Sequence, residues 1–87
     1  MQKLLMFHMA SCPHCKRALA YAEELKKRRP ELADVQVEMV DERLDPDRAN
    51  RYDYWYVPAY YLGDELLFSG SPTPADIERV FESAYNA

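Results

Sequence analysis

The chain has 87 residues, of which 48% are hydrophobic and 30% are charged, and its formal net charge is −4. This length predicts one domain that spans residues 1–87, and the hydrophobic content is typical of a globular protein and not of a disordered one. The acidic balance offers no electrostatic footprint for nucleic acid, and no apolar run approaches the roughly 20 residues of a membrane span, so neither is expected as a partner.

The N-terminal segment has neither a long apolar stretch nor a small-residue cleavage site of the kind that a leader peptide carries. We therefore expect a cytoplasmic protein. Residues 4–7 are a continuous apolar run of four, which predicts a strand buried on both faces.

Both cysteines follow this run, Cys12 and Cys15, in the tetrapeptide C-P-H-C. So short a loop removes little entropy from the unfolded chain, so the pair is a poor structural staple. In a reducing compartment such a pair indicates redox catalysis or metal binding.

A helix is expected next, with Pro13 in its first turn, where the missing N–H is tolerated, and Pro30 at its end. Its apolar stripe is formed by four residues at helical spacing: Ala18, Leu19, Ala22 and Leu25. After the helix, the alternation of Val35, Val37 and Met39 with polar residues predicts a strand with one wetter face.

Asp45 and Pro46 form a cap and first turn for a short second helix with Ala49 and Tyr52 on its inner side. Residues 59–62 and 65–68 predict two strands, and Gly63-Asp64 between them matches a type II′ hairpin turn. The last helix begins with a capping box over residues 73–76. Its apolar face follows: Ile77, Val80, Phe81 and Ala84.

The predicted order is strand, helix, strand, helix, strand, strand, helix. The first βαβ unit requires a parallel pair with a right-handed crossover, and the hairpin adds two antiparallel strands. The fold class is therefore α/β, with a four-stranded mixed sheet and helices on both faces.

At this point the sequence resembles the thioredoxin superfamily, and in length it is most similar to a glutaredoxin. The resemblance depends on the Cys12–Cys15 tetrapeptide after the first strand, on Val57-Pro58 before the third strand, and on the order of elements. It implies a thioredoxin-like βαβαββα fold, sheet order 2-1-3-4 and a cis bond before Pro58.

The resemblance also implies a dithiol oxidoreductase that reduces or exchanges protein or glutathione mixed disulfides through Cys12 and Cys15. Such a protein would take part in redox homeostasis and electron transport, and a reductase would be its electron donor. No tightly bound cofactor is expected, although glutathione is a possible co-substrate, and we expect a monomer.

The sequence departs from both subfamilies at identifiable positions. Where glutaredoxins carry a Gly-Gly pair and acidic residues, residues 69–74 read S-G-S-P-T-P, and Met9 replaces the lysine that many glutaredoxins have before the motif. Where thioredoxins carry a buried aspartate and a tryptophan, this chain has Met6 and Ser11.

The expected chemistry divides labour between the two thiols. Cys12 should lie at the N-terminal edge of the first helix, where free N–H groups stabilise a thiolate. Cys15 lies one turn further in and should stay protonated longer. Cys12 would attack a substrate disulfide, and Cys15 would then resolve the mixed disulfide.

One histidine, His8, precedes this pair of cysteines, and the other, His14, lies between them. We expect an imidazolium at His14 to lower the pKa of Cys12 and to raise the reduction potential above the roughly −270 mV of a thioredoxin; the alternative is a solvated helix residue. His8 either relays protons to Cys15 or is a partly buried residue with a backbone partner.

A binding groove is expected beside Cys12, because a cis proline would present the backbone of Val57 to an extended peptide or to glutathione. The residues assigned to it are Pro13, Tyr56, Val57, Pro58, Gly70 and Ser71. The aromatic residues Tyr54, Trp55 and Tyr56 precede the proline, and groove lining and packing are equally open for them.

Two other classes of function remain. The four residues His8, Cys12, His14 and Cys15 could bind zinc or share an iron–sulfur cluster between two chains, although structural zinc usually needs a second, distant ligand pair. A redox-inactive binding module on the same frame is the third hypothesis.

Overall fold

The elements of the chain follow the predicted order. The computed structural model describes residues 1–87, and a 3-10 turn, η1, is added between the first helix and the second strand. None of the helices combines the length and the apolar character that crossing a bilayer requires. The elements are β1 (Leu4–His8), α1 (Pro13–Arg28), η1 (Pro30–Asp34), β2 (Val37–Asp41), α2 (Pro46–Ala49), β3 (Ala59–Leu62), β4 (Glu65–Ser69) and α3 (Pro74–Tyr85).

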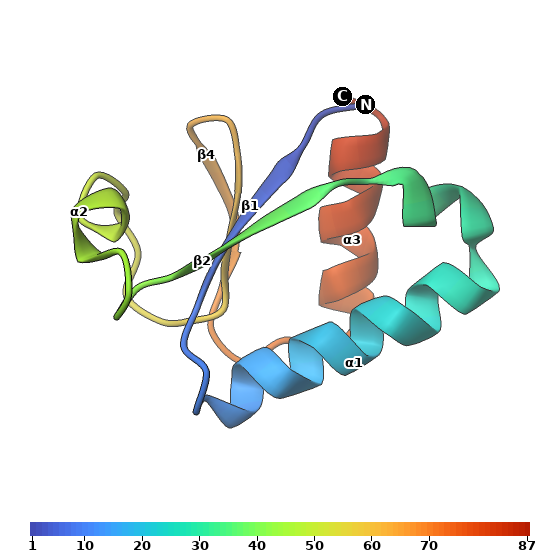
Figure 1. The fold of residues 1–87 in the computed structure, drawn as a ribbon. Helices are drawn as coiled ribbons and strands as arrows, with labels where there is room; N and C mark the ends of the chain where they lie inside the picture. Colours follow the sequence, from blue (N-terminus) through green and yellow to red (C-terminus); the bar gives the residue numbers. More distant parts are fainter.

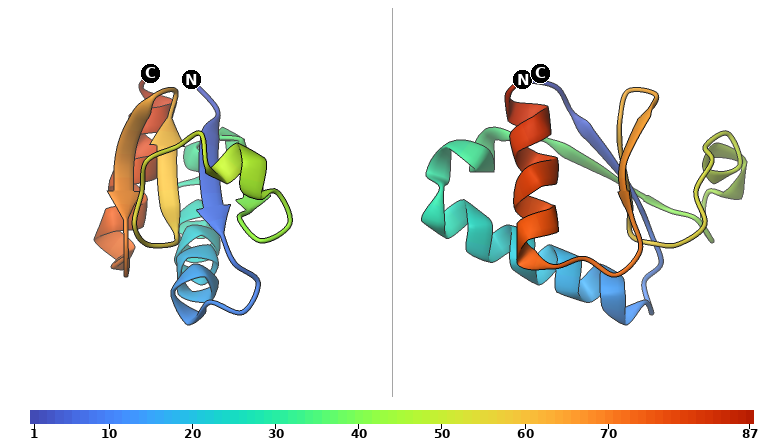
Figure 2. Two further views of the ribbon diagram at one scale, coloured as in Figure 1. Left: turned by 90° about the vertical axis from the view of Figure 1, so that its left-hand side faces the viewer. Right: turned by 180° about the vertical axis from the view of Figure 1, so that it is seen from behind.

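The four strands form one mixed sheet in the order β2-β1-β3-β4. β1 and β2 are parallel and pair from Leu4–Val37 to His8–Asp41, whereas β1–β3 and β3–β4 are antiparallel. Figure 1 and the turned views of Figure 2 show α1 and α3 against one face of the sheet and α2 beyond the other. The predicted fold class and strand order are therefore confirmed.

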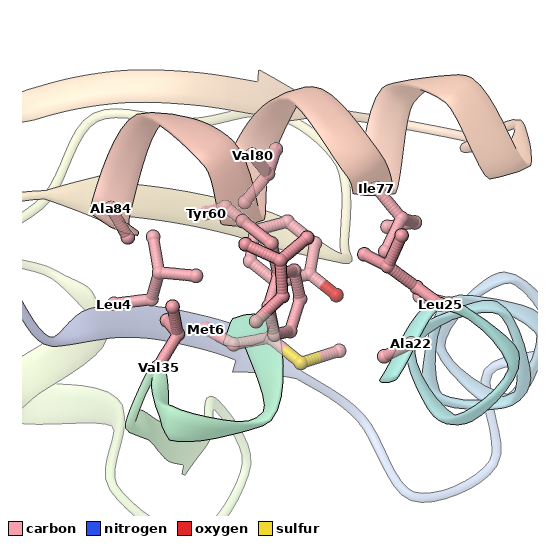
Figure 3. Close-up of a cluster of buried hydrophobic side chains, with 12 residues drawn as sticks. Leu4, Met6, Ala22, Leu25, Val35, Tyr60, Ile77, Val80 and Ala84 are labelled. Carbon is pink, nitrogen blue, oxygen red and sulfur yellow. The ribbon is translucent and has the colours of Figure 1, made fainter. Parts of the chain in front are cut away.

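The face covered by α1 and α3 buries the larger apolar cluster, here called the helical core. Leu4 and Met6 of β1 and Tyr60 of β3 converge with Ile77, Val80 and Ala84 of α3 in this cluster (Figure 3). Its twelve residues are Leu4, Met6, Ala18, Ala22, Leu25, Leu32, Val35, Tyr60, Ile77, Val80, Phe81 and Ala84.

The opposite face buries a second cluster, here called the cysteine cluster, because both cysteines belong to it. Side chains alternate along a strand, so Leu5 and Phe7 of β1 point to this face while their neighbours enter the helical core. The nine members are Leu5, Phe7, Cys12, Cys15, Val40, Ala49, Val57, Ala59 and Tyr61.

The buried stripe of α1 differs from the prediction at one position. Cys15, Ala18, Ala22 and Leu25 are buried, whereas Leu19 is 40% exposed. Leu19 lies about 100° around the helix from Ala18, at the edge of the buried stripe, where it lines a recess open to solvent with Met39 of β2. The stripe therefore begins at a cysteine, so the packing of α1 and the position of its second thiol are linked.

The second strand begins later than predicted and buries other residues. Val35 is buried but lies just after η1, and β2 starts at Val37. Met39 is 43% exposed and Val40 is buried in the cysteine cluster. Met39 pairs with Met6 and lies on the sheet face that α1 covers, but β2 is an edge strand, so this helix covers the Met39 side chain only in part.

The turn and cap predictions are confirmed. Gly63 has a positive φ of 60° and no other residue of the hairpin turn does, as a type II′ turn requires. Thr73 and Asp76 form a reciprocal capping box at the start of α3, and the Asp45 side chain caps α2. These caps satisfy N–H groups that would otherwise lack partners at the helix ends.

Candidate active site

Both cysteines lie where β1 passes into α1. Cys12 is the N-cap residue with extended backbone angles (φ −82°, ψ 118°), Pro13 takes the first helical position, and Cys15 lies within the first turn. The N–H of Cys12 donates to the Met9 carbonyl at 3.2 Å, which closes the turn leading into the helix. Both thiols are free. The predicted placement of the pair at a helix start is therefore observed.

The pKa of Cys12 is lowered below its ordinary value by the balance of opposing effects. Burial raises the pKa, since the residue is only 8% exposed. Hydrogen bonds from the backbone and thiol of Cys15 and from the backbone of His14, together with the charge of Arg17, outweigh that burial. Cys12 is thus the thiol that ionises more easily.

The pKa of Cys15 moves the other way. Burial is the largest cause and raises the pKa of this thiol to about 11, although a backbone hydrogen bond from Met9 opposes it. The hydrogen bond and negative charge of Cys12 and the charge of Glu42 raise it further. Two thiols in one helical turn are therefore tuned in opposite directions, as a nucleophile and a resolving group need.

The segment before β3 approaches Cys12 from across the sheet. The Val57–Pro58 bond is cis, as expected, and the Cys12 thiol donates to the Val57 carbonyl at 3.8 Å. Gly70, with a φ of 124°, donates its N–H to the Pro58 carbonyl at 3.2 Å. Three of the predicted groove residues thus meet beside the reactive sulfur.

The remaining predicted groove residues lie at the rim. Tyr56 is 70% exposed, and its backbone is held by Ser69, whose hydroxyl donates to the Tyr56 carbonyl at 2.6 Å. Pro13 and Ser71 are also exposed. The binding role of these residues stays a prediction.

The aromatic run divides between packing and exposure. Tyr52 and Tyr54 pack on Phe7, each with ring centroids 4.9 Å apart, and Tyr54 is stacked at 18°. Trp55 is 88% exposed beside Tyr56. Packing therefore explains the first two rings, and only Trp55 and Tyr56 are free to contact a partner.

The ring of His14 contacts Arg17, and no hydrogen bond joins this ring to Cys12. Its Nδ1 is hydrogen-bonded to the Arg17 guanidinium. His14 acts on Cys12 through its backbone, and the side-chain cation that acts on Cys12 is Arg17. The predicted imidazolium has no support in this geometry, and the tuning role of His14 stays a prediction.

His8 ends β1, is half-buried, and makes no side-chain hydrogen bond, so the expected backbone partner for its ring is not found. Its carbonyl instead accepts the N–H of Glu42 at 3.0 Å. Glu42 is the acidic residue whose charge acts on Cys15.

Sequence reasoning missed Arg17 and Glu42. Arg17 could have been found one turn after His14 on the same helix face. Glu42 could have been found because the ends of parallel neighbouring strands meet at the same edge of the sheet. No three His, Cys, Asp or Glu side chains converge in a way that could hold a metal ion, so the geometry lends no support to the metal hypothesis.

Comparison with protein families identifies similarity along nearly the whole chain. Residues 4–82 match the family model described as Thioredoxin domain. A protein named Thioredoxin from Methanocaldococcus jannaschii is 31% identical over 71 residues, which cover 82% of this chain and 81% of that protein. A Probable Thioredoxin from Methanothermobacter thermautotrophicus is 32% identical over 79 residues, 90% of this chain and 86% of that protein.

Solved structures show the same fold at lower identity. The oxidised thioredoxin of Plasmodium falciparum has a TM-score of 0.67 and 17% identity, covering 93% of this chain and 78% of its own. The Fasciola hepatica thioredoxin has a TM-score of 0.67 and 19% identity, covering 94% and 79%. These relatives and structures bear the name thioredoxin, so the names do not support the glutaredoxin subtype that the chain length suggested.

Proposed function

The chain belongs to the thioredoxin-domain family, and from this premise we propose that it reduces protein disulfides through Cys12 and Cys15. As a thioredoxin-like redox protein it needs one thiol that ionises readily and another that stays protonated until the first has reacted. The opposite displacement of the two cysteine pKa values, within one helical turn, is the observation that carries the proposal.

The reaction proceeds in two balanced exchanges. The Cys12 thiolate attacks one sulfur of the substrate disulfide, forms a mixed disulfide and releases the first substrate thiol. The Cys15 sulfur then attacks Cys12, which closes the Cys12–Cys15 disulfide and releases the second thiol. The substrate gains two electrons and two protons, and an external reductase restores the dithiol.

Substrate docking is assigned to the backbone of Val57 and to the exposed rings of Trp55 and Tyr56. An extended peptide could pair with the open backbone before Pro58, where the Val57 carbonyl contacts Cys12, while the two exposed aromatic side chains just before Val57 supply apolar contact area. A protein disulfide is favoured over glutathione because the 69–74 stretch lacks the Gly-Gly and acidic pattern of glutaredoxins.

An insulin-reduction assay with an external dithiol as electron source tests the proposal. Cys12→Ser should abolish reduction, because no nucleophile remains, whereas Cys15→Ser should trap a mixed disulfide that mass spectrometry detects. Circular dichroism checks that both variants fold. Full activity of Cys12→Ser would contradict the proposal, and faster reduction of glutathione mixed disulfides than of insulin would reassign the substrate.

A further inference from the structure

Glu42 is a half-buried acidic residue that the two exchanges above leave without a role. It directly follows β2, and its N–H bonds to the last carbonyl of β1, on His8, at 3.0 Å. None of the ion pairs of the structure includes it. A carboxylate at the edge of a buried cluster without a cationic partner is unusual and calls for an explanation.

Tyr54 holds the Glu42 carboxylate in place. Its hydroxyl donates to Oε1 of Glu42 at 2.8 Å, and its ring stacks on Phe7, which packs in the cysteine cluster with Cys15. Burial and the hydrogen bond to Glu42 raise the pKa of Tyr54, so its hydroxyl remains a donor. The carboxylate is therefore fixed beside the active-site cluster and is not free to swing into solvent.

Cys15 needs a proton acceptor before it can attack. Burial is the largest cause that raises the pKa of Cys15, and it persists when Cys12 is bonded to the substrate, so this thiol stays largely protonated at pH 7. The titratable groups that face Cys15 are Cys12 on α1, Glu42 after β2 and Tyr60 on β3. Cys12 is consumed in the mixed disulfide and burial raises the pKa of Tyr60, so among these groups the Glu42 carboxylate is the one suited to take the proton.

We propose that Glu42 takes the proton from the Cys15 thiol as Cys15 attacks the mixed disulfide, a role that rests on the proposed oxidoreductase function. The S–H bond of Cys15 breaks and its electron pair forms the Cys15–Cys12 bond, while the bond from Cys12 to the substrate sulfur breaks. The substrate leaves as a thiolate, and the proton on Glu42 passes to that thiolate or to water.

The proton has a path back to solvent. A recess of about 300 Å³ lies between α2 and residues 52–55, and Glu42 and Tyr54 both line it. Water that enters this recess can reach the carboxylate without passing Cys12. The base can therefore be regenerated while a bulky protein substrate still covers the sulfurs.

One substitution distinguishes proton transfer from a simple charge effect, because the two predict opposite changes in the rate at which the mixed disulfide is resolved. The charge of Glu42 raises the pKa of Cys15, so Glu42→Gln should lower that pKa. If Glu42 acted only as a charge, the variant would resolve mixed disulfides faster at pH 7, because more thiolate would be present. If Glu42 accepts the proton, resolution becomes slower despite the lower pKa.

The experiment is a stopped-flow reaction of the fully reduced protein with neutral dithiodipyridine. Attack by Cys12 releases one thiopyridone in a phase that depends on reagent concentration, and closure by Cys15 releases a second in a phase that does not. For Glu42→Gln we expect an unchanged first phase and a second phase about 10- to 100-fold slower at pH 7. The second-phase rate of this variant should then rise with pH more steeply than in the wild type.

Three variants complete the design. Asp47→Asn removes an exposed charge from α2 and should leave both phases unchanged. Tyr54→Phe keeps the ring stacked but releases the carboxylate, and should slow only the second phase, by about two- to tenfold. Glu42→Asp should restore part of the second-phase rate.

Two results would overturn the inference, and they are distinguishable. A second phase in Glu42→Gln that is as fast as in the wild type, or faster, rules out Glu42 as proton acceptor and leaves the oxidoreductase function standing. A wild-type protein that shows no second phase at all overturns the proposed function, and the role of Glu42 with it.

Discussion

The two faces of the sheet have different compositions and different tasks. The helical core is covered by the two long helices and contains neither of the thiols that react, although one of its twelve residues, Tyr60, lies close enough to Cys15 to interact with its charge. The cysteine cluster is covered only by the four-residue α2 and by the aromatic rings of residues 52–54, and it contains both thiols. One strand supplies both faces, since Met6 enters the helical core and Phe7 enters the cysteine cluster.

This difference separates folding stability from reactivity. Burial in the helical core acts almost entirely on apolar side chains, and the hydroxyl of Tyr60 is the one ionisable group among its twelve residues. In the cysteine cluster burial acts on ionisable groups, so the same low-polarity environment shifts the pKa of Cys15 and Tyr54. Substitutions on the first face should therefore change the free energy of unfolding, and substitutions on the second should change rates and pH dependence.

The largest effect is expected from Phe81→Ala in the helical core. Phe81 is 2% exposed, and removing its ring should lower the free energy of unfolding by about 3–5 kcal/mol. Urea unfolding followed by circular dichroism measures this loss. The rate constants of both thiol phases should stay within about twofold of wild type while the protein is folded; a selective loss of the Cys15 phase would contradict the separation of the two faces.

The next effect concerns the reduced protein at alkaline pH. Because the pKa of Cys15 rises from 9.0 to about 11 on folding, the folded state keeps a proton that the unfolded state releases. The resulting stability is present in full below about pH 9 and is lost as pH rises towards 11, by up to about 2–3 kcal/mol. Urea unfolding at pH 8 and pH 11 should show a larger fall in the free energy of unfolding for the wild type than for Cys15→Ser. An equal fall in the two proteins would contradict this prediction.

A smaller effect is expected from Trp55→Ala at the exposed rim. The side chain is 88% exposed, so the free energy of unfolding should change by less than about 0.5 kcal/mol. The KM for a protein disulfide should rise about three- to tenfold, with the rate towards dithiodipyridine unaffected. Leu44→Ala, also exposed at 84%, is the matched control, and an equal rise in KM there would argue against a specific role for Trp55.

The smallest effect is expected at the exposed end of α1. Arg17→Met should raise the pKa of Cys12, because the guanidinium charge lowers it, and should slow alkylation of Cys12 near neutral pH about two- to threefold. Lys16→Met, which removes the neighbouring cation, should have less effect. His14→Ala should also change the rate less than Arg17→Met, since it retains the backbone N–H that faces the sulfur; the reverse ranking would favour the imidazole as the tuning group.

Much of the fold could be predicted because its signals are local. The capping box of Thr73 and Asp76, the positive φ at Gly63 and the proline positions each depend on a few adjacent residues. Leu19 and Met39 were assigned wrongly because periodicity shows which residues share a face, and only the tertiary structure shows where that face ceases to be covered.

In the candidate site, too, local features could be predicted from the sequence and features that depend on the tertiary structure could not. The positions of Cys12 and Cys15 follow from a helix start, which is a local feature, whereas the effect of Glu42 requires the parallel register that brings Asp41 beside His8. The contribution of Arg17 was missed for a related reason. The sequence places two candidate cations on one turn but does not show that the first accepts a hydrogen bond from the second.

The single tryptophan of the chain gives the molecule a built-in optical probe. Trp55 is surrounded by solvent in the folded protein, so its emission should change little on unfolding and is a poor measure of stability. A substrate that docks beside Cys12 would shield the indole and shift its emission to shorter wavelength. Fluorescence titration of an unlabelled Cys15→Ser protein could therefore follow the arrival of substrates in real time.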